Sequence, residues 1–263
     1  MTNGANQVRK IIEDEKTGIS RRLSADVRIA AQGYSNIAGV LAGFAFTVIV
    51  LVVQMNDTSA SAAAIAISRN ISTVGFLAAF FGCVLSAFSF SLLASEEALT
   101  PRAHNMALFA GAGFSIAMSL LFWSLAVLLR TFLLNEAADL AYQVFPLFVI
   151  IHPAYVAASV LDSIYIFEIR RPNIKEILSV LAPSYLLLLT ALLCRLFRFS
   201  VDIRASTSFF SLIIWTSILA IIINSILAAI FSAIDEKYRI NLKSIGVWMG
   251  LQSVIICLLV ISI

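Results

Sequence analysis

Seven apolar runs of roughly 20 residues recur along this 263-residue chain, and short polar connectors separate them. A run of about 20 residues crosses the hydrocarbon core of a bilayer, about 30 Å thick, as one helix. Backbone amides in hydrocarbon must be hydrogen-bonded within the protein, and none of the runs alternates with the period of a barrel strand. The sequence therefore predicts an all-α, multi-pass transmembrane helical bundle with about seven spans, at residues 36–54, 73–94, 107–133, 143–167, 177–198, 207–232 and 245–263.

The composition excludes a soluble globular protein. Hydrophobic residues make up 60% of the chain and charged residues 13%, whereas soluble domains carry about 25% charged residues. The polar residues before the first run and in the connectors are too few to build a second hydrophobic core. We therefore expect two regions, a cytoplasmic N-terminal arm at 1–35 and a transmembrane helical domain at 36–263.

The distribution of Lys and Arg predicts the orientation in the membrane. With seven spans and a cytoplasmic N-terminus, 13 of the 18 Lys and Arg residues fall in cytoplasmic segments, which are the segments that retain positive charge. The polar arm lacks the apolar core and cleavage site of a removable signal peptide. We therefore expect a multi-pass protein of the plasma (inner) membrane that contacts anionic lipids.

The N-terminal arm ends in a basic amphipathic segment. Apolar residues recur at helical spacing from Ile19 to Tyr34, with arginines on the other faces. This pattern predicts either an interfacial helix or the beginning of one long helix that continues into the first span. The small-residue connector at 56–72 predicts a separate helix on the outer surface.

The first span carries small and polar residues on one helical face. Asn36, Gly39, Gly43, Thr47 and Gln54 are separated by steps of three, four, four and seven residues, which place them on the same side of a helix. The two glycines form a small-xxx-small pair, which lets another helix approach closely. The face indicates either plain helix–helix packing or the lining of a pore in an oligomer.

The stretch LAGFAFTVIVLVVQMND at 41–57 resembles the pore helix of Orai-type calcium channels. That helix has a leucine and a small residue before Gly-Phe-Ala, which stand here as Gly43, Phe44 and Ala45, and valine-rich turns follow. The resemblance covers the first span of this chain only, and the family has four spans where seven are expected here. It implies that the first span lines an ion-conducting pore.

The resemblance also implies roles for individual residues. The family's pore helix extends into the cytoplasm with basic residues at every fourth position, of which Arg28 matches one, while Gln32 and Asn36 replace others. Leu51 stands where the family has its selectivity glutamate, and a pore without an acidic ring discriminates weakly or gates by dewetting at apolar side chains. The predicted pore-lining and gate residues are Arg28, Asn36, Val40, Gly43, Phe44, Thr47, Leu51 and Gln54.

A second polar stripe lies in the fourth expected span. His152, Tyr155, Ser159 and Asp162 follow helical spacing and share one face. An ionisable side chain facing lipid costs roughly 3 kcal/mol, so this stripe should face protein or water. It predicts either a path for protons or cations or an interhelical hydrogen-bond seam, and Asn224 in the sixth span, with Thr216 and Ser217, is its expected partner.

The sequence lacks the motifs of several classes of protein. The chain has two histidines and no HExxH motif, and its three cysteines all lie in apolar runs, so we expect neither a metal site nor a disulfide framework. No nucleophile has a suitably placed histidine, and no basic–aromatic nucleic-acid motif occurs. We therefore expect no enzyme activity, no cofactor and no nucleic-acid partner.

These features predict an ion channel or pore-forming subunit that assembles as a homo-oligomer around its first span. Two other interpretations stay open. A transporter of a small solute or ion would place its site in spans four to six. A membrane scaffold or accessory subunit would bind a soluble partner through the N-terminal arm and would transport nothing.

Overall fold

Six long helices make up most of the structure, which is a computed structural model. It describes residues 27–54, 62–96, 100–132, 134, 136–138, 140–141, 173–196, 207–234 and 240–261, and no strand occurs among them. The helices are α2 (Val27–Gln54), α3 (Ala62–Ala94), α4 (Pro101–Thr131), α6 (Ile174–Leu196), α7 (Thr207–Ala233) and α8 (Leu242–Ile261).

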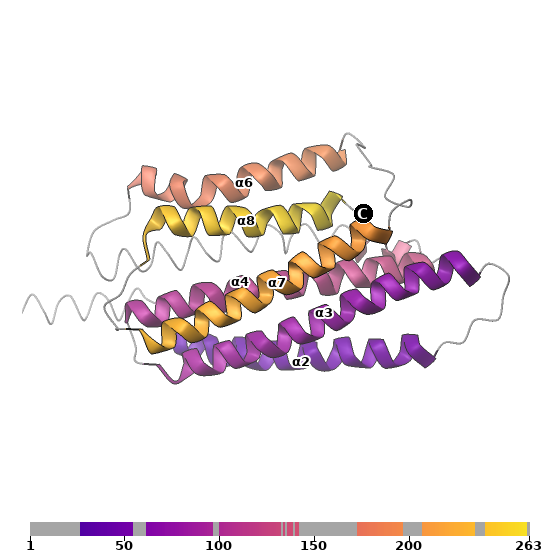
Figure 1. Ribbon diagram of the computed structural model, residues 1–263, viewed down its shortest axis with the longest axis horizontal. Helices are drawn as coiled ribbons and strands as arrows, with labels where there is room; N and C mark the ends of the chain where they lie inside the picture. Colours follow the sequence, from indigo (N-terminus) through magenta and orange to yellow (C-terminus); the bar gives the residue numbers. More distant parts are fainter. Residues whose placement is uncertain are drawn as a thin grey trace, which may run out of the picture.

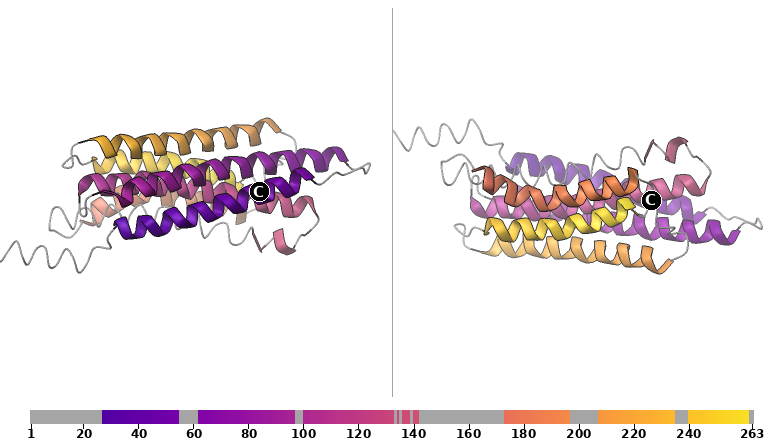
Figure 2. Two further views of the ribbon diagram at one scale, coloured as in Figure 1. Left: turned by 90° about the horizontal axis from the view of Figure 1, so that it is seen from below. Right: turned by 90° about the horizontal axis from the view of Figure 1, so that it is seen from above.

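The helices lie side by side along the long axis of the molecule (Figures 1 and 2). The helices α2, α3, α4 and α7 form one bundle, in which α3 contacts each of the other three. The helices α6 and α8 pack as a parallel pair, and α8 joins this pair to α4 and α7 through a smaller contact. The fold is therefore a four-helix bundle with a helix pair attached to one side.

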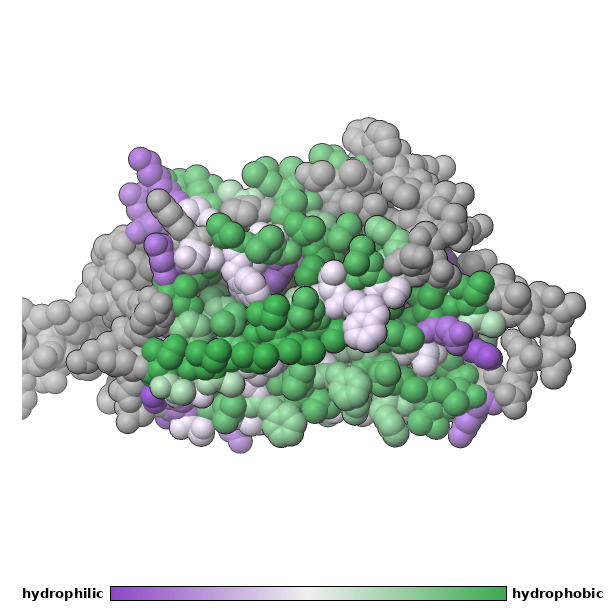
Figure 3. All heavy atoms as spheres, in the orientation of Figure 1, coloured by the Kyte–Doolittle hydropathy of each residue, from purple (hydrophilic) through white to green (hydrophobic). Residues whose placement is uncertain are grey.

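Four of these helices are long and apolar enough to cross a membrane: Val27–Gln54, Ala66–Ala94, Pro101–Thr131 and Phe209–Ala233. The apolar stretch of α8, Ser244–Leu259, is shorter. Figure 3 shows a hydrophobic band across the face in view, with hydrophilic side chains gathered toward the two ends of the long axis. Such a band between polar ends is typical of an integral membrane protein.

The expected all-α architecture is confirmed for the described residues. Each of the six helices overlaps an expected span, and four of the six are long and apolar enough to cross a membrane. The expected span at 143–167 lies outside the described residues, so the number of seven spans and the cytoplasmic N-terminus stay predictions. The helix α2 begins at Val27 and continues without a break to Gln54. From Val27 onward, the structure therefore favours one long helix over a separate interfacial helix.

The connector at 56–72 was expected to form a separate surface helix, and this prediction is wrong from residue 62 onward. Residues 62–72 instead form the first turns of the 33-residue helix α3. The physical reason is that these turns are rich in alanine and contain neither Gly nor Pro, so nothing interrupts the helix before the apolar run begins.

Polar residues mark the turn between α3 and α4. The side chain of Thr100 accepts a hydrogen bond from Ala103 N at 3.1 Å, and Pro101 occupies the first helical position, where its missing N–H costs nothing. Arg102 Nη2 lies 2.6 Å from Glu96 Oε2 across the turn. These contacts direct α4 back along α3.

The core of the bundle is centred on α4, the most buried of the four membrane-length helices. Its Trp123, Ile116 and Leu120 are fully buried and pack with Phe76 of α3 and Ile221 of α7. In contrast, only 22% of the apolar window of α2 is buried, against 61% for α4. The helix α2 therefore covers the bundle on one side and leaves most of its own surface open.

Candidate functional site

The exposed face of α2 contains seven of the eight residues predicted to line a pore. All seven are exposed, with Val40 74%, Leu51 54% and Phe44 46% accessible. The face lies opposite the side of α2 that packs against α3. We call this surface the outward face; its residues are Asn36, Val40, Gly43, Phe44, Thr47, Leu51 and Gln54.

Small residues hold the opposite side of α2 against α3. The buried positions are alanines and one valine, which allow the two helices to lie close together: Ala31, Ala38, Ala42, Ala45 and Val52. Ser35 Oγ donates a hydrogen bond to Ala87 O at 3.0 Å and lies 2.9 Å from Ser91 Oγ. Tyr34 stacks on Phe90 with ring centroids 5.4 Å apart. These contacts fix the rotation of α2 and so determine which residues point outward.

The glycines of α2 pack against nothing in the part of the chain that the structure describes. A Cβ atom built at Gly33, Gly39 or Gly43 would meet nothing within 4 Å. Each glycine in a helix costs about 1 kcal/mol relative to alanine, and no contact among the described residues compensates for this cost. The described part of the chain therefore gives no structural reason for the small-xxx-small pair at Gly39 and Gly43.

The polar side chains of the outward face differ in how they are satisfied. Thr47 Oγ1 donates to the carbonyl of Gly43 at 2.9 Å on its own helix. Asn36 and Gln54 make no side-chain hydrogen bond within the described part of the chain. Their amides remain available to water or to a neighbouring molecule.

Arg28 is the one predicted pore residue that the structure does not place on the outward face. Its side chain is half-buried, and Nη1 donates to the carbonyl of Glu96 at the end of α3, 3.4 Å away. The described structure therefore links Arg28 to the α3–α4 turn.

The second predicted site is only partly described. His152, Tyr155, Ser159 and Asp162 lie outside the described residues. Asn224 is described, and its side chain is fully buried in α7. Its amide nitrogen donates to Ala220 O at 2.9 Å on the same helix.

The partners of Asn224 come from α8. Asn224 Oδ1 accepts hydrogen bonds from Gln252 Nε2 at 2.9 Å and from Trp248 Nε1 at 3.2 Å. These two bonds join the helix pair α6–α8 to the four-helix bundle. We call Asn224, Trp248 and Gln252 the polar junction.

The predicted partnership of Asn224, Thr216 and Ser217 with the stripe in the fourth expected span lies outside the described residues. The hydroxyls of Thr216 and Ser217 bond carbonyls of their own helix. Ser217 Oγ donates to Ile213 O at 2.8 Å, and Thr216 Oγ1 donates to Leu212 O at 2.9 Å. A hydroxyl that bonds the carbonyl four residues earlier is satisfied without another helix. Sequence reasoning missed Trp248 and Gln252, although two polar groups four residues apart in an apolar run are a signal that could have found them.

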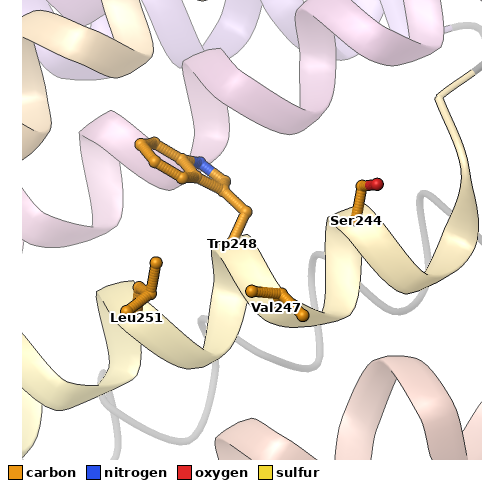
Figure 4. A pocket seen from close by; sticks show the side chains of 4 residues that line it. All are labelled: Ser244, Val247, Trp248 and Leu251. Atoms are coloured by element: carbon orange, nitrogen blue, oxygen red, sulfur yellow. The ribbon is translucent and has the colours of Figure 1, made fainter.

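A groove runs along α8 beside the polar junction. It has a volume of about 340 Å³, and Ser244, Val247, Trp248 and Leu251 line it. Figure 4 shows that these four side chains come from successive turns of α8. Trp248 therefore borders the groove and donates its indole N–H to Asn224 in the interior.

Comparisons of the chain with protein families, with curated proteins and with solved structures found no match. The outward face of α2 and the polar junction are the two features of the described structure that bear on function.

Proposed function

We propose that this membrane protein is a channel or pore-forming subunit that assembles from identical chains, with the outward face of α2 lining the pore. The observation that carries the proposal is the exposure of seven predicted pore residues on one side of a helix that is anchored by its other side. A ring of such subunits would bring this face to a common axis and keep the bundle outside.

Two features of the exposed surface of α2 support water or protein there in preference to lipid. The amides of Asn36 and Gln54 have no partner within the described residues, and an unsatisfied amide is poorly solvated by acyl chains. Gly39 and Gly43 have open space around them, which suits the close approach of another helix. The resemblance of residues 41–57 to the Orai-type pore helix favours the same assignment.

The chemistry of the face predicts weak selectivity. Its seven residues are neutral, so a pore lined by them would have no acidic ring to hold a divalent cation. Phe44 and Leu51 would form apolar rings that gate the pore by excluding water. Thr47 would present its remaining oxygen lone pairs between these two rings.

Cysteine accessibility in reconstituted protein tests the proposal. The full chain with its three native cysteines replaced is prepared with Thr47→Cys or Phe46→Cys, and ionic current is recorded before and after a water-soluble thiol reagent. Both residues are exposed, but Phe46 lies off the outward face and its ring contacts Phe80 with centroids 5.9 Å apart. We expect block with Thr47→Cys and none with Phe46→Cys. Absence of conductance, or equal block in both variants, would contradict the proposal.

The polar junction favours a second candidate, a transporter of a small solute or ion. Its supporting observation is that a buried asparagine joins two groups of helices beside a groove. A transporter predicts pH-dependent uptake that Asp162→Asn abolishes and Gly43→Leu leaves intact. The channel predicts that Gly43→Leu abolishes flux and that Asp162→Asn leaves it intact.

A further inference from the structure

Glu96 joins three helices at the turn between α3 and α4. Its carboxylate oxygen Oε2 accepts a hydrogen bond from Arg102 Nε at 2.8 Å and lies 2.6 Å from Arg102 Nη2, in the first turn of α4. Its carbonyl oxygen accepts a hydrogen bond from Arg28 Nη1 at 3.4 Å, in the first turn of α2. Its backbone N–H donates to Leu93 O at the end of α3. One residue therefore connects the beginnings of α2 and α4 to the end of α3.

The ion pair between Glu96 and Arg102 is shielded from water. The two side chains are 11% and 20% exposed, and two nitrogens of the guanidinium share one carboxylate oxygen. A charge-assisted contact of this kind is stronger than a neutral hydrogen bond, and salt screens it less than a pair in open solvent. The side chain of Glu96 is thus held to α4 and its N–H to α3, so its carbonyl is held in position for Arg28.

The first seven residues of α2 have few other contacts. Among residues 27–33, Ala31 is buried, Val27 and Arg28 are half-buried, and the other four are exposed. The ring contact that fixes α2 against α3 begins only at Tyr34. At 1.5 Å per residue, Arg28 lies about 9 Å beyond Tyr34 along the helix axis. Its bond to Glu96 therefore holds the N-terminal end of α2, which is otherwise largely exposed.

We infer that Glu96 is a positioning residue for one mouth of the proposed pore, because it holds the N-terminal end of α2 against the α3–α4 turn. The inference rests on the proposed function, in which the outward face of α2 points to the axis of a ring. In that arrangement α3 lies behind α2, so the bond from Arg28 keeps this end of α2 away from the axis. Loss of the carboxylate frees the turn, and the end of α2 then moves toward the axis and narrows the mouth.

Pulsed electron paramagnetic resonance on the reconstituted full chain measures this movement. The three native cysteines are replaced, and a spin label is attached at Gly33→Cys, an exposed position where an added Cβ meets nothing within 4 Å. The label reports the distance between copies of the chain, and ionic current is recorded from the same preparation. We expect Glu96→Gln to shorten this distance and to lower the ratio of conducting to closed channels roughly tenfold, the factor that about 1.4 kcal/mol produces.

Two further variants separate positioning from a general disturbance of the turn. Arg28→Gln leaves the ion pair of Glu96 intact and should shorten the distance by the same amount. The double variant should show no further change, because both substitutions act on one chain of contacts. Ser95→Ala is the matched control, since Ser95 is exposed and its hydroxyl donates to Leu92 O at 2.7 Å within the same turn. It should leave both the distance and the current unchanged.

The outcomes distinguish this inference from the proposed function. A native chain that shows no conductance, or no defined distance between labels, overturns both. A conducting native chain whose distance and current stay the same in Glu96→Gln and Arg28→Gln overturns the positioning role alone. An equal shift in Ser95→Ala also overturns it, because any change in the turn would then have the same effect.

Discussion

The exposed glycines of α2 and the glycines inside the helix packing have the same chemistry and opposite surroundings. A Cβ on Gly246 would lie 2.5 Å from the carbonyl oxygen of Ser179, and one on Gly82 would lie 2.8 Å from Ile221 Cδ1. A Cβ on Gly39 or Gly43 would touch nothing. Gly246 therefore lets α8 approach α6, and Gly82 lets α3 approach α4 and α7.

This difference separates two requirements on the chain. The interior glycines are needed for the fold, because a larger residue would force helices apart. The α2 glycines make no such contact with the described residues, and the proposed function gives them a role in contact with a second molecule.

The largest effect is expected for Gly246→Ala. Its methyl group would collide with the backbone of α6, and such overpacking costs about 3 kcal/mol. Reversible unfolding in mixed micelles measures the change in the free energy of unfolding. Gly43→Ala is the matched control, and an equal loss in both variants would remove the distinction between the two classes of glycine.

Asn224→Leu should have the next largest effect. The substitution leaves the indole N–H of Trp248 and the side-chain amide of Gln252 without their acceptor, which costs about 2 kcal/mol. The same unfolding assay measures it. Ser217→Ala is the control, because its hydroxyl bonds only its own helix; similar losses would show that the polar junction does not hold α8 to α7.

Gly43→Ala should leave the free energy of unfolding unchanged or raise it by at most about 1 kcal/mol. The same variant should reduce conductance in reconstituted membranes, because the added methyl groups would crowd the pore axis. Planar bilayer recordings measure the conductance. Phe46→Leu serves as a control off the outward face, and unchanged conductance in Gly43→Ala would place this face away from the pore.

The smallest effect is expected for Ser35→Ala. It removes the hydrogen bond to Ala87 O, and hydrogen bonds between membrane helices are worth about 0.6 kcal/mol on average. The alanine side of α2 would still pack against α3. Crosslinking between introduced cysteines on the two helices would detect any rotation of α2, and a large rotation would show that this bond, rather than the alanine packing, sets its orientation.

Periodicity in the sequence predicted that Asn36, Gly43, Thr47 and Gln54 share one side of the first span, because residues at helical spacing share a side, and all four are exposed in α2. That this side lines a pore stays a prediction, which periodicity does not test.

Periodicity could not place Arg28, whose position came from the resemblance and whose side chain instead reaches the carbonyl of Glu96. Spacing along one helix also does not reveal that carbonyls of α7 already satisfy the hydroxyls of Thr216 and Ser217, or that Trp248 and Gln252 of α8 bond Asn224.

The sequence by itself determined the helical class and the apolar stretches at the centre of the described helices, because hydrocarbon leaves backbone amides no partner except their own helix. Only the tertiary structure decided which side of α2 is covered and which residues of α8 meet Asn224. Those outcomes depend on how closely neighbouring helices approach and how each is rotated, and the packing of small residues such as Ala38, Gly82 and Gly246 against other helices sets both.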